Sequence, residues 1–268
     1  MHTSETSGIF NKFNINILGS GTQPMIFAHG FGCDQNMFRF LYPYFQDDYK
    51  IILFDFVGAG KSDLSAYDAE KYSSLQAYAD DVLSICEELE LKDVVYVGHS
   101  VSAMTGILAS IKKPEYFSKL VLIGPSPRYI NDDKYTGGFD EAAILELLDT
   151  LDSNYLGWSQ AMAPVIMGNE DRPHLGEELS NSFCQADPEI AKNFARVTFL
   201  SDNRDDLKKV SVPSLIIQCK QDVIAPVEVG EYINENIGPS TLKIIDATGH
   251  CPNLSAPEET AKAMQDFL

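Results

Sequence analysis

The sequence GHSVS at residues 98–102 constrains the fold of this chain more than any other stretch. It follows the apolar run Val94–Val97 and precedes a helix-like segment at residues 103–109, so Ser100 stands at the turn between a strand and a helix. Such a turn is sharp and requires small residues close to the serine. It is typical of a serine whose hydroxyl is exposed for nucleophilic attack. Ser102 stands where a second glycine is usual, so the setting carries more weight than the bare pattern.

A serine hydroxyl is a weak nucleophile at neutral pH, so it needs a base within reach and a carboxylate that orients the base. Asp222 comes just after the apolar run at residues 214–219, and His250 comes shortly after another run at residues 242–246. Taken singly, Asp222 has the alternative role of a turn or cap residue, and His250 that of a structural histidine. Together they follow Ser100 in the chain order of α/β-hydrolases, so we predict a Ser100, Asp222 and His250 triad.

The loop HGFG at residues 29–32 follows a predicted strand and is a candidate for stabilising developing negative charge. It matches a loop whose backbone N–H, with that of the residue after the nucleophile, forms an oxyanion hole. We expect Phe31 and Val101 to provide these two N–H groups. His29 and His99 are expected to be structural, because His29 is placed to fix the loop and the side chain of His99 points away from its neighbour.

Apolar runs typical of strands alternate with helical patterns through most of the chain. The predicted strands lie near residues 13–18, 24–28, 50–54, 93–97, 119–123, 213–219 and 242–246. The predicted helices among them lie near residues 35–45, 74–90, 101–112, 226–236 and 257–268. This alternation indicates an α/β fold with a mostly parallel central sheet and helices on both faces.

The alternation stops between Pro125 and about Asp206, where helical patterns follow one another. These patterns span Glu141–Leu151, Tyr155–Met167, Glu177–Gln185 and Pro188–Leu200. Asp187 followed by Pro188 is a strong helix start, because Asp caps the helix and Pro suits its first position. A helical insertion at this point would lie above the carboxyl ends of the strands as a lid. The predicted division is a core of residues 1–124 and 206–268 and a lid of residues 125–205.

Several large apolar residues of the predicted lid are candidates for a substrate pocket over Ser100. They are Phe139, Trp158, Met162 and Phe199, joined by Phe31 from the core. Packing of the lid helices against one another is the alternative role for each of them.

Composition excludes several classes of function. The chain has 20 Lys and Arg against 39 Asp and Glu, which gives a formal net charge of −19. Such a surface repels phosphate backbones and anionic lipid, so we expect neither a nucleic-acid nor a membrane partner. A basic protein partner and simple solubility are both compatible with this charge. The five histidines lack the spacing of metal ligands, and we expect no metal and no cofactor.

The first 20 residues lack a secretory signal pattern, and no apolar run approaches the ~18 residues needed to span a bilayer. The five cysteines are odd in number and widely spaced, so we expect reduced thiols. These features predict a soluble cytoplasmic protein. Cys251 lies next to His250, and a packing role is favoured there over a reactive one.

Five stretches of this sequence together resemble the RsbQ group of bacterial hydrolases and its plant relatives, the karrikin and strigolactone receptors. The stretches are GFGCDQ at 30–35, GHSVSAM at 98–104, SPRYIND at 126–132, GGF at 137–139 and FLSD at 199–202. The similarity runs over nearly the whole chain, and the plant receptors also resemble it at Ser102. It implies an α/β-hydrolase core with a V-shaped cap of four helices over a small, apolar, largely closed pocket.

By position, the resemblance assigns the triad and the oxyanion donors to the residues predicted above. It also implies that Phe139 and Phe199 are pocket aromatics, and Met162 stands where relatives can carry phenylalanine.

Two hypotheses of function follow. In the first, the protein hydrolyses a small hydrophobic ester or lactone through a Ser-His-Asp mechanism. In the second, the same chemistry is slow and the lid reports ligand occupancy to a protein partner, which the resemblance to RsbQ implies is a stress-pathway phosphatase. A cofactor-free perhydrolase uses the same three residues and is a further alternative, whereas dehalogenases and epoxide hydrolases need an aspartate in place of Ser100.

Overall fold

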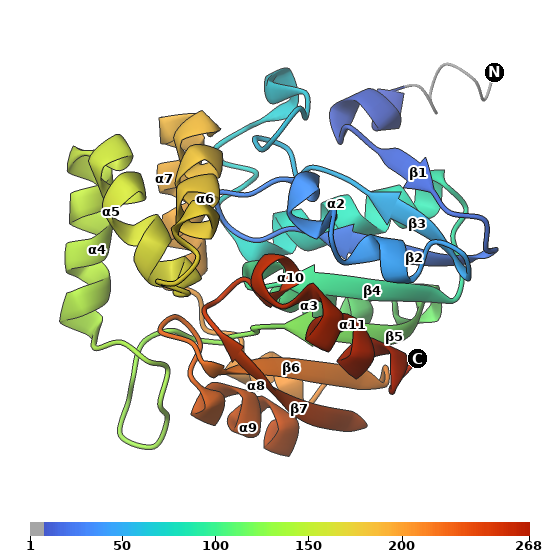
Figure 1. Cartoon of the computed structure of the whole chain (residues 1–268). Helices are drawn as coiled ribbons and strands as arrows, with labels where there is room; N and C mark the ends of the chain where they lie inside the picture. The colour runs from blue at the N-terminus through green and yellow to red at the C-terminus, as the bar shows by residue number, and fades with distance from the viewer. Residues whose placement is uncertain (1–7) are drawn as a thin grey trace.

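A seven-stranded sheet forms the centre of the protein in a computed structural model that describes residues 8–268 (Figure 1). The strands are β1 (Asn16–Leu18), β2 (Gln23–Ala28), β3 (Tyr49–Leu53), β4 (Val94–His99), β5 (Phe117–Ile123), β6 (Ser214–Gln221) and β7 (Ser240–Thr248). Their order across the sheet is β1-β3-β2-β4-β5-β6-β7. Within the described chain only β1 pairs antiparallel with its neighbour, so the predicted mostly parallel sheet is confirmed.

Helices cover both faces of this sheet. The helices are α2 (Leu75–Glu88), α3 (Val101–Lys112), α4 (Glu141–Ser153), α5 (Tyr155–Met167), α6 (Pro173–Gln185), α7 (Pro188–Phe199), α8 (Arg204–Leu207), α9 (Val227–Asn236), α10 (Pro252–Ser255) and α11 (Pro257–Gln265). Val94 and Tyr96 of β4 face the core under α2, α3 and α9, whereas Val95 and Val97 face the core under α11. β4 is therefore buried on both sides, as its continuous apolar run predicts. No helix of residues 8–268 combines the length and apolar character needed to cross a membrane.

The prediction of one helix near residues 35–45 is wrong. The chain forms two 3₁₀ helices there, η1 (Gln35–Phe38) and η2 (Tyr42–Tyr44). Pro43 explains the break, because proline lacks the N–H that a continuous α-helix would donate to the carbonyl four residues earlier. Phe38 is still fully buried against the sheet, so the apolar spacing reflected burial rather than a continuous helix.

Four successive helices, α4 to α7, stand together at one end of the sheet (Figure 1). In the sequence they lie between β5 and β6. We call them the helical insertion. The predicted series of four helices is confirmed, although α6 begins at Pro173 rather than at Glu177, with proline in its first turn. Asp187 caps α7 as predicted, because its carboxylate accepts the N–H groups of Glu189 and Ile190 at 2.9 and 3.2 Å.

The helical insertion is bonded to loops that follow the sheet strands. The Ser182 hydroxyl donates to the carbonyl of Gly32, just beyond β2, at 2.8 Å. The N–H of His250, just beyond β7, donates to the carbonyl of Ile166 in α5 at 2.9 Å. The insertion therefore lies over the carboxyl ends of the strands. The exact division into a core and a lid stays a prediction.

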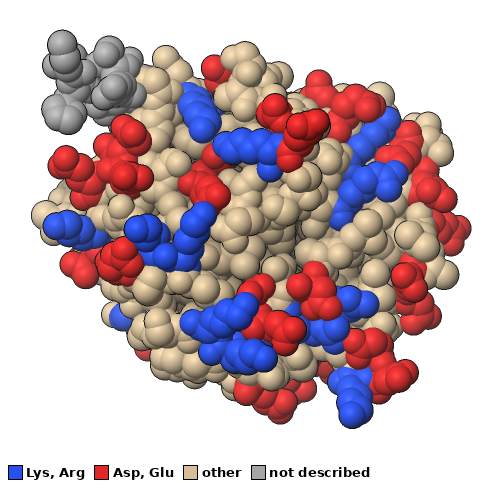
Figure 2. Space-filling view, turned by 180° about the vertical axis from the view of Figure 1, so that it is seen from behind, with Lys and Arg blue, Asp and Glu red and all other residues tan. Residues whose placement is uncertain are grey.

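Charged side chains of both signs are interspersed over the face seen in Figure 2. Lys and Arg side chains lie next to Asp and Glu side chains there. Ion pairs on the surface of the described chain include those of Lys112 with Asp80 and of Lys209 with Asp206. The net charge of −19 is consequently not concentrated in a single acidic patch on this face.

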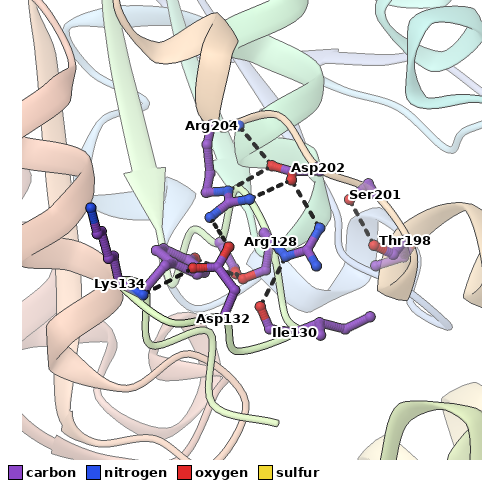
Figure 3. Close-up of polar contacts among 10 residues, drawn as sticks. Arg128, Ile130, Asp132, Lys134, Thr198, Ser201, Asp202 and Arg204 are labelled. Carbon is purple, nitrogen blue, oxygen red and sulfur yellow. Dashed lines mark hydrogen bonds and ion pairs between the residues drawn. The ribbon is translucent and has the colours of Figure 1, made fainter. Parts of the chain in front are cut away.

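The chain segments that enter and leave the helical insertion are clamped together by four charged residues, which we call the base cluster (Figure 3). Arg128 and Asp132 belong to the segment after β5, and Asp202 and Arg204 to the segment after α7. The Asp202 carboxylate accepts from Arg128 at 2.9 Å and from Arg204 at 2.7 Å, and Arg204 also donates to Asp132 at 2.5 Å. A backbone bridge between Arg128 and Asp202 aligns the two segments.

Electrostatics of the base cluster favour its charged form. Burial raises the pKa of Asp202, but hydrogen bonds from Arg204 outweigh burial and hold that pKa below its ordinary value. Hydrogen bonding to Arg204 likewise lowers the pKa of Asp132. These carboxylates contribute stability above their unfolded pKa of ~3.9, and that contribution is lost as the pH falls through their lower folded pKa.

We expect Asp202→Asn to lower the free energy of unfolding at pH 7 by about 1 kcal/mol, because it removes the charge shared by two arginines on a partly exposed surface. The difference from the parent should shrink in high salt and as the pH falls below ~4. Thermal melting at several pH values measures it. Asp205→Asn, at an exposed position of α8, is the matched control, and an equal effect of both variants would contradict a clamp.

Candidate active site

Ser100 occupies the turn between β4 and α3 with φ 58° and ψ −125°. Such a conformation costs a residue with a Cβ atom on the order of 1–3 kcal/mol, so its surroundings must hold it in place. The Ser100 N–H donates to the carbonyl of Ile123 at the end of β5, at 2.8 Å. A Cβ atom on Gly98 would lie 2.5 Å from the carbonyl oxygen of Ser102, so glycine is required for α3 to start this close to β4.

Ser102 has a structural role that explains its presence in the motif. It is fully buried, and its hydroxyl donates to the carbonyl of His29. His29 is the first residue of the loop that follows β2, which we call the β2 loop. Its own carbonyl accepts the hydroxyl of Tyr96 at 2.8 Å. A buried hydroxyl without a partner would be costly, so these bonds make serine acceptable at this position. They also tie the first turn of α3 to the β2 loop beside Ser100.

The fold brings Ser100, His250 and Asp222 into one chain of hydrogen bonds. His250 Nε2 lies 2.7 Å from Ser100 Oγ, and His250 Nδ1 lies 2.7 Å from Asp222 Oδ2. The other carboxylate oxygen, Oδ1, accepts the N–H groups of Ile224 and Ala225 at 2.8 and 3.1 Å. This arrangement favours a proton on Nδ1 and leaves Nε2 free to accept the proton of Oγ.

The loop that carries His250 is held by both the sheet and the helical insertion. The His250 N–H donates to Ile166 of α5, and the His250 carbonyl lies 2.7 Å from Nε2 of His99 at the end of β4. Gly249 has φ +90°, and a Cβ atom there would lie 1.8 Å from the carbonyl oxygen of Met167. Only glycine fits between the loop and the end of α5.

His29 and His99 both make structural contacts, as the sequence suggested. His29 Nε2 accepts the N–H of Phe56 at 3.1 Å, and its Nδ1 donates to the carbonyl of Gly30 at 2.9 Å. Burial, with a contribution from the neighbouring His250, lowers the pKa of His99 to about 3. His99 is therefore neutral at physiological pH, and its Nε2 donates to the His250 carbonyl.

Phe31 and Val101 are the predicted oxyanion donors. Phe31 lies in the loop after β2, and Val101 begins α3 directly after Ser100. Val101 is the first residue of α3, so its N–H has no carbonyl one turn earlier in the helix to bond to. A Cβ atom on Gly30 would lie 3.2 Å from the Cβ atom of Ser100, which shows how closely the β2 loop passes the serine. Within residues 8–268 no backbone carbonyl accepts the N–H of Phe31 or of Val101, so both N–H groups are available to a ligand.

A small apolar cavity of about 30 Å³ opens beside Ser100 and His250. It includes Phe31, Trp158 and Phe199, three of the predicted pocket residues. The other residues around it are Cys33, His99, Tyr129, Ile166, Leu179, Phe183, Thr198, Ile224 and Cys251. A cavity of this size has room for about two water molecules.

Phe139 and Met162, also predicted for the pocket, do not line this cavity. The Phe139 N–H donates to the carbonyl of Tyr129 at 3.1 Å, and this pairing places Tyr129, rather than Phe139, at the cavity wall. Met162 lies on α5 between Trp158 and Ile166, which do line the cavity, and it is only partly buried. Both residues pack against the surrounding core instead.

Sequence reasoning missed several cavity residues, of which Tyr129 and Phe183 are the largest. Leu179 and Phe183 are spaced i and i+4 on α6, a spacing that indicates one apolar helix face. That spacing does not say which cavity the face covers. Tyr129 lies in an irregular segment, where no periodic pattern could have marked it.

Three of the cysteines in the described part of the chain are poor nucleophiles. Burial raises the pKa of Cys33, Cys219 and Cys251, so these thiols stay protonated and are poor nucleophiles. All five cysteines are free. Residues 8–268 contain no group of three or more potential ligands that could hold a metal ion.

The sheet, the helical insertion and the serine turn define the class of α/β-hydrolases. The model of the alpha/beta hydrolase family matches residues 25–263, and the chain belongs to this family. It is 42% identical over 247 residues to karrikin insensitive 2 receptor IA of Petunia hybrida, covering 92% of this chain and 90% of that protein. It is 42% identical over 262 residues to strigolactone esterase RMS3 of Pisum sativum, covering 97% of this chain and 98% of that protein.

A solved structure of a hydrolase from Oleispira antarctica is also similar to this chain. It superposes with a TM-score of 0.95 at 41% identity and covers 98% of this chain and 96% of that one. The resemblance to karrikin and strigolactone receptors that the sequence motifs suggested is confirmed by these relatives.

We expect His99→Gln to change how the stability depends on pH. The folded pKa of His99, about 3, lies below the ordinary value of 6.5. The unfolded chain therefore takes up a proton between these values that the folded chain does not, and the parent loses stability as the pH falls through this window. Because glutamine cannot titrate, the variant should lose less stability between pH 7 and pH 5, although it starts about 1–2 kcal/mol lower.

Urea unfolding at each pH measures this difference. His174→Gln, at an exposed position of α6, is the control and should retain the pH dependence of the parent. An unaltered dependence in His99→Gln would show that His99 titrates normally in the folded protein.

Proposed function

We propose that this protein is a serine hydrolase that cleaves a small hydrophobic ester or lactone. The observation that supports this most directly is the continuous hydrogen-bond chain from Asp222 through His250 to Ser100, with 2.7 Å at both contacts. The adjacent cavity is apolar, which suits an uncharged substrate. The relatives named strigolactone esterase and hydrolase agree with this class of reaction.

In the proposed reaction, His250 Nε2 takes the proton of Ser100 as Oγ attacks the carbonyl carbon of the substrate. The N–H groups of Phe31 and Val101 donate to the oxygen that becomes negative, and such a donor typically contributes ~10²–10³ in rate. The imidazolium then gives its proton to the departing alkoxide. A water molecule, deprotonated by the same nitrogen, cleaves the acyl-serine and releases the acid.

A second candidate function is slow-turnover reception of a ligand, with the helical insertion signalling to a protein partner. It is favoured by the bond between His250 and Ile166, which couples the reacting histidine directly to α5. The relatives named karrikin insensitive 2 receptors support it as well. By resemblance to the RsbQ group, the partner would be a protein phosphatase. Both functions use the same three residues.

We expect Ser100→Ala to lower the turnover of a short-chain ester such as p-nitrophenyl acetate by roughly three to six orders of magnitude, because the nucleophile is lost. Ser110→Ala is the matched control, since that hydroxyl bonds only within α3. Circular dichroism verifies that both variants are folded. A turnover unchanged in Ser100→Ala would exclude this serine as the nucleophile.

The lifetime of the acyl-serine separates the two candidate functions. Typical enzyme turnover of ~1–10³ s⁻¹ requires the acyl group to leave Ser100 within about one second. Intact-mass measurement after quenching at successive times follows this adduct. As a hydrolase, the protein should lose the added mass on that scale, whereas an adduct that persists for minutes would favour the receptor.

A further inference from the structure

The cavity beside Ser100 has room for the reacting carbonyl group and small substituents only, and a larger cavity lies directly behind Phe31. It has a volume of about 130 Å³, against about 30 Å³ for the cavity at the serine. One wall is the loop from Phe56 to Lys61 after β3, and the other is formed by the end of α6 and the start of α7. Lys61 and Gln185 are exposed at its mouth, so it can be reached from solvent.

Phe31 and Cys33 line both cavities, and the Phe31 ring has aromatic neighbours on both sides. Its ring lies 5.9 Å from that of Phe194, which belongs to the larger cavity. On the other side it lies 6.1 Å from Trp158 and 6.2 Å from Phe199, which belong to the cavity at Ser100. These are aromatic contacts rather than hydrogen bonds, so a movement of this side chain breaks no polar bond.

The ring of Tyr78 forms part of the wall of the larger cavity. Tyr78 is 2% exposed, and its ring stacks on Phe194 at 4.5 Å. Its hydroxyl is fully buried, so it is not exposed to the cavity. Apolar residues form most of the rest of the wall, and Asp34, Lys61, Ser182 and Gln185 also line it. The nitrogens of His29, the other polar ring in the wall, are already bonded.

We propose that this second cavity is a binding subsite for an apolar group of about six carbons. The size follows from comparison with an engineered apolar cavity of ~150 Å³, which binds benzene. In the proposed reaction the ester or lactone carbonyl lies at Ser100, and the remainder of the substrate extends past Phe31 into the subsite. This role of the subsite rests on the proposed function. Binding of the group itself does not depend on catalysis.

Binding is tested with cyclohexanone and its isosteric hydrocarbon, methylenecyclohexane, titrated into the protein and followed by amide NMR shifts of residues 56–61 and 186–194. Both probes should bind the parent and produce saturable shifts of these amides. The absence of a saturable shift with either probe would overturn the subsite.

Filling the cavity gives an independent test of its location. Ala191→Phe on α7 and Ala186→Phe in the turn before it both place a ring in the space, and either should abolish binding of both probes. Val197→Phe, on the same helix but facing an outer groove, is the matched control and should bind as the parent does. Undiminished binding in a folded Ala191→Phe or Ala186→Phe variant would overturn the subsite.

Ester hydrolysis then tests the role in the reaction. In a pH-stat, Ala191→Phe should leave ethyl acetate within about twofold of the parent. It should reduce kcat/KM at least tenfold for hexyl acetate or ethyl hexanoate, and the ester affected shows which side of the carbonyl enters. An equal loss for all three esters, or no loss for either long one, would overturn the subsite. If Ser100→Ala still hydrolysed esters while the titrations behaved as expected, the proposed function alone would fail.

Discussion

The positive φ of Ser100 is the constraint on which the rest of the site depends. A serine does not adopt this conformation unless its neighbours hold it, and here they hold it from three directions. The Ser100 N–H is bonded to β5, Gly98 lets α3 begin close to β4, and Ser102 ties α3 to the β2 loop. The strain places the Ser100 hydroxyl at the end of the sheet, where the loops after β6 and β7 bring Asp222 and His250 to it.

The helical insertion belongs to this site as much as the sheet does. Through Ile166 it holds the backbone of His250, and through Trp158 and Phe199 it encloses the space beside the serine. The base cluster fixes the two segments where the insertion meets the sheet. A movement of α5 would therefore act on the backbone of His250 through a single hydrogen bond. The hydrolase and receptor hypotheses consequently use the same residues and the same contact.

Phe31 links the proposed chemistry to the proposed selection of substrate. Its backbone N–H is a donor to the oxyanion in the proposed reaction. Its side chain lies between the cavity at Ser100 and the larger cavity bounded by α7. Because backbone and side chain act separately, the ring can rotate while the N–H keeps its position. The packing of Tyr78 and Phe194 behind it then decides what the second cavity accepts.

The sequence by itself determined the strand order along the chain, the serine turn, the four consecutive helices and the residue types of the hydrogen-bond chain. These features are local: an apolar period, a cap such as Asp187, or a glycine next to a serine is written in adjacent residues. The tertiary structure decided what distant segments bring together. It excluded Phe139 and Met162 from the cavity at Ser100, brought in Tyr129 and Phe183, and opened a second cavity behind Phe31, because side-chain packing between separate elements has no period along the chain.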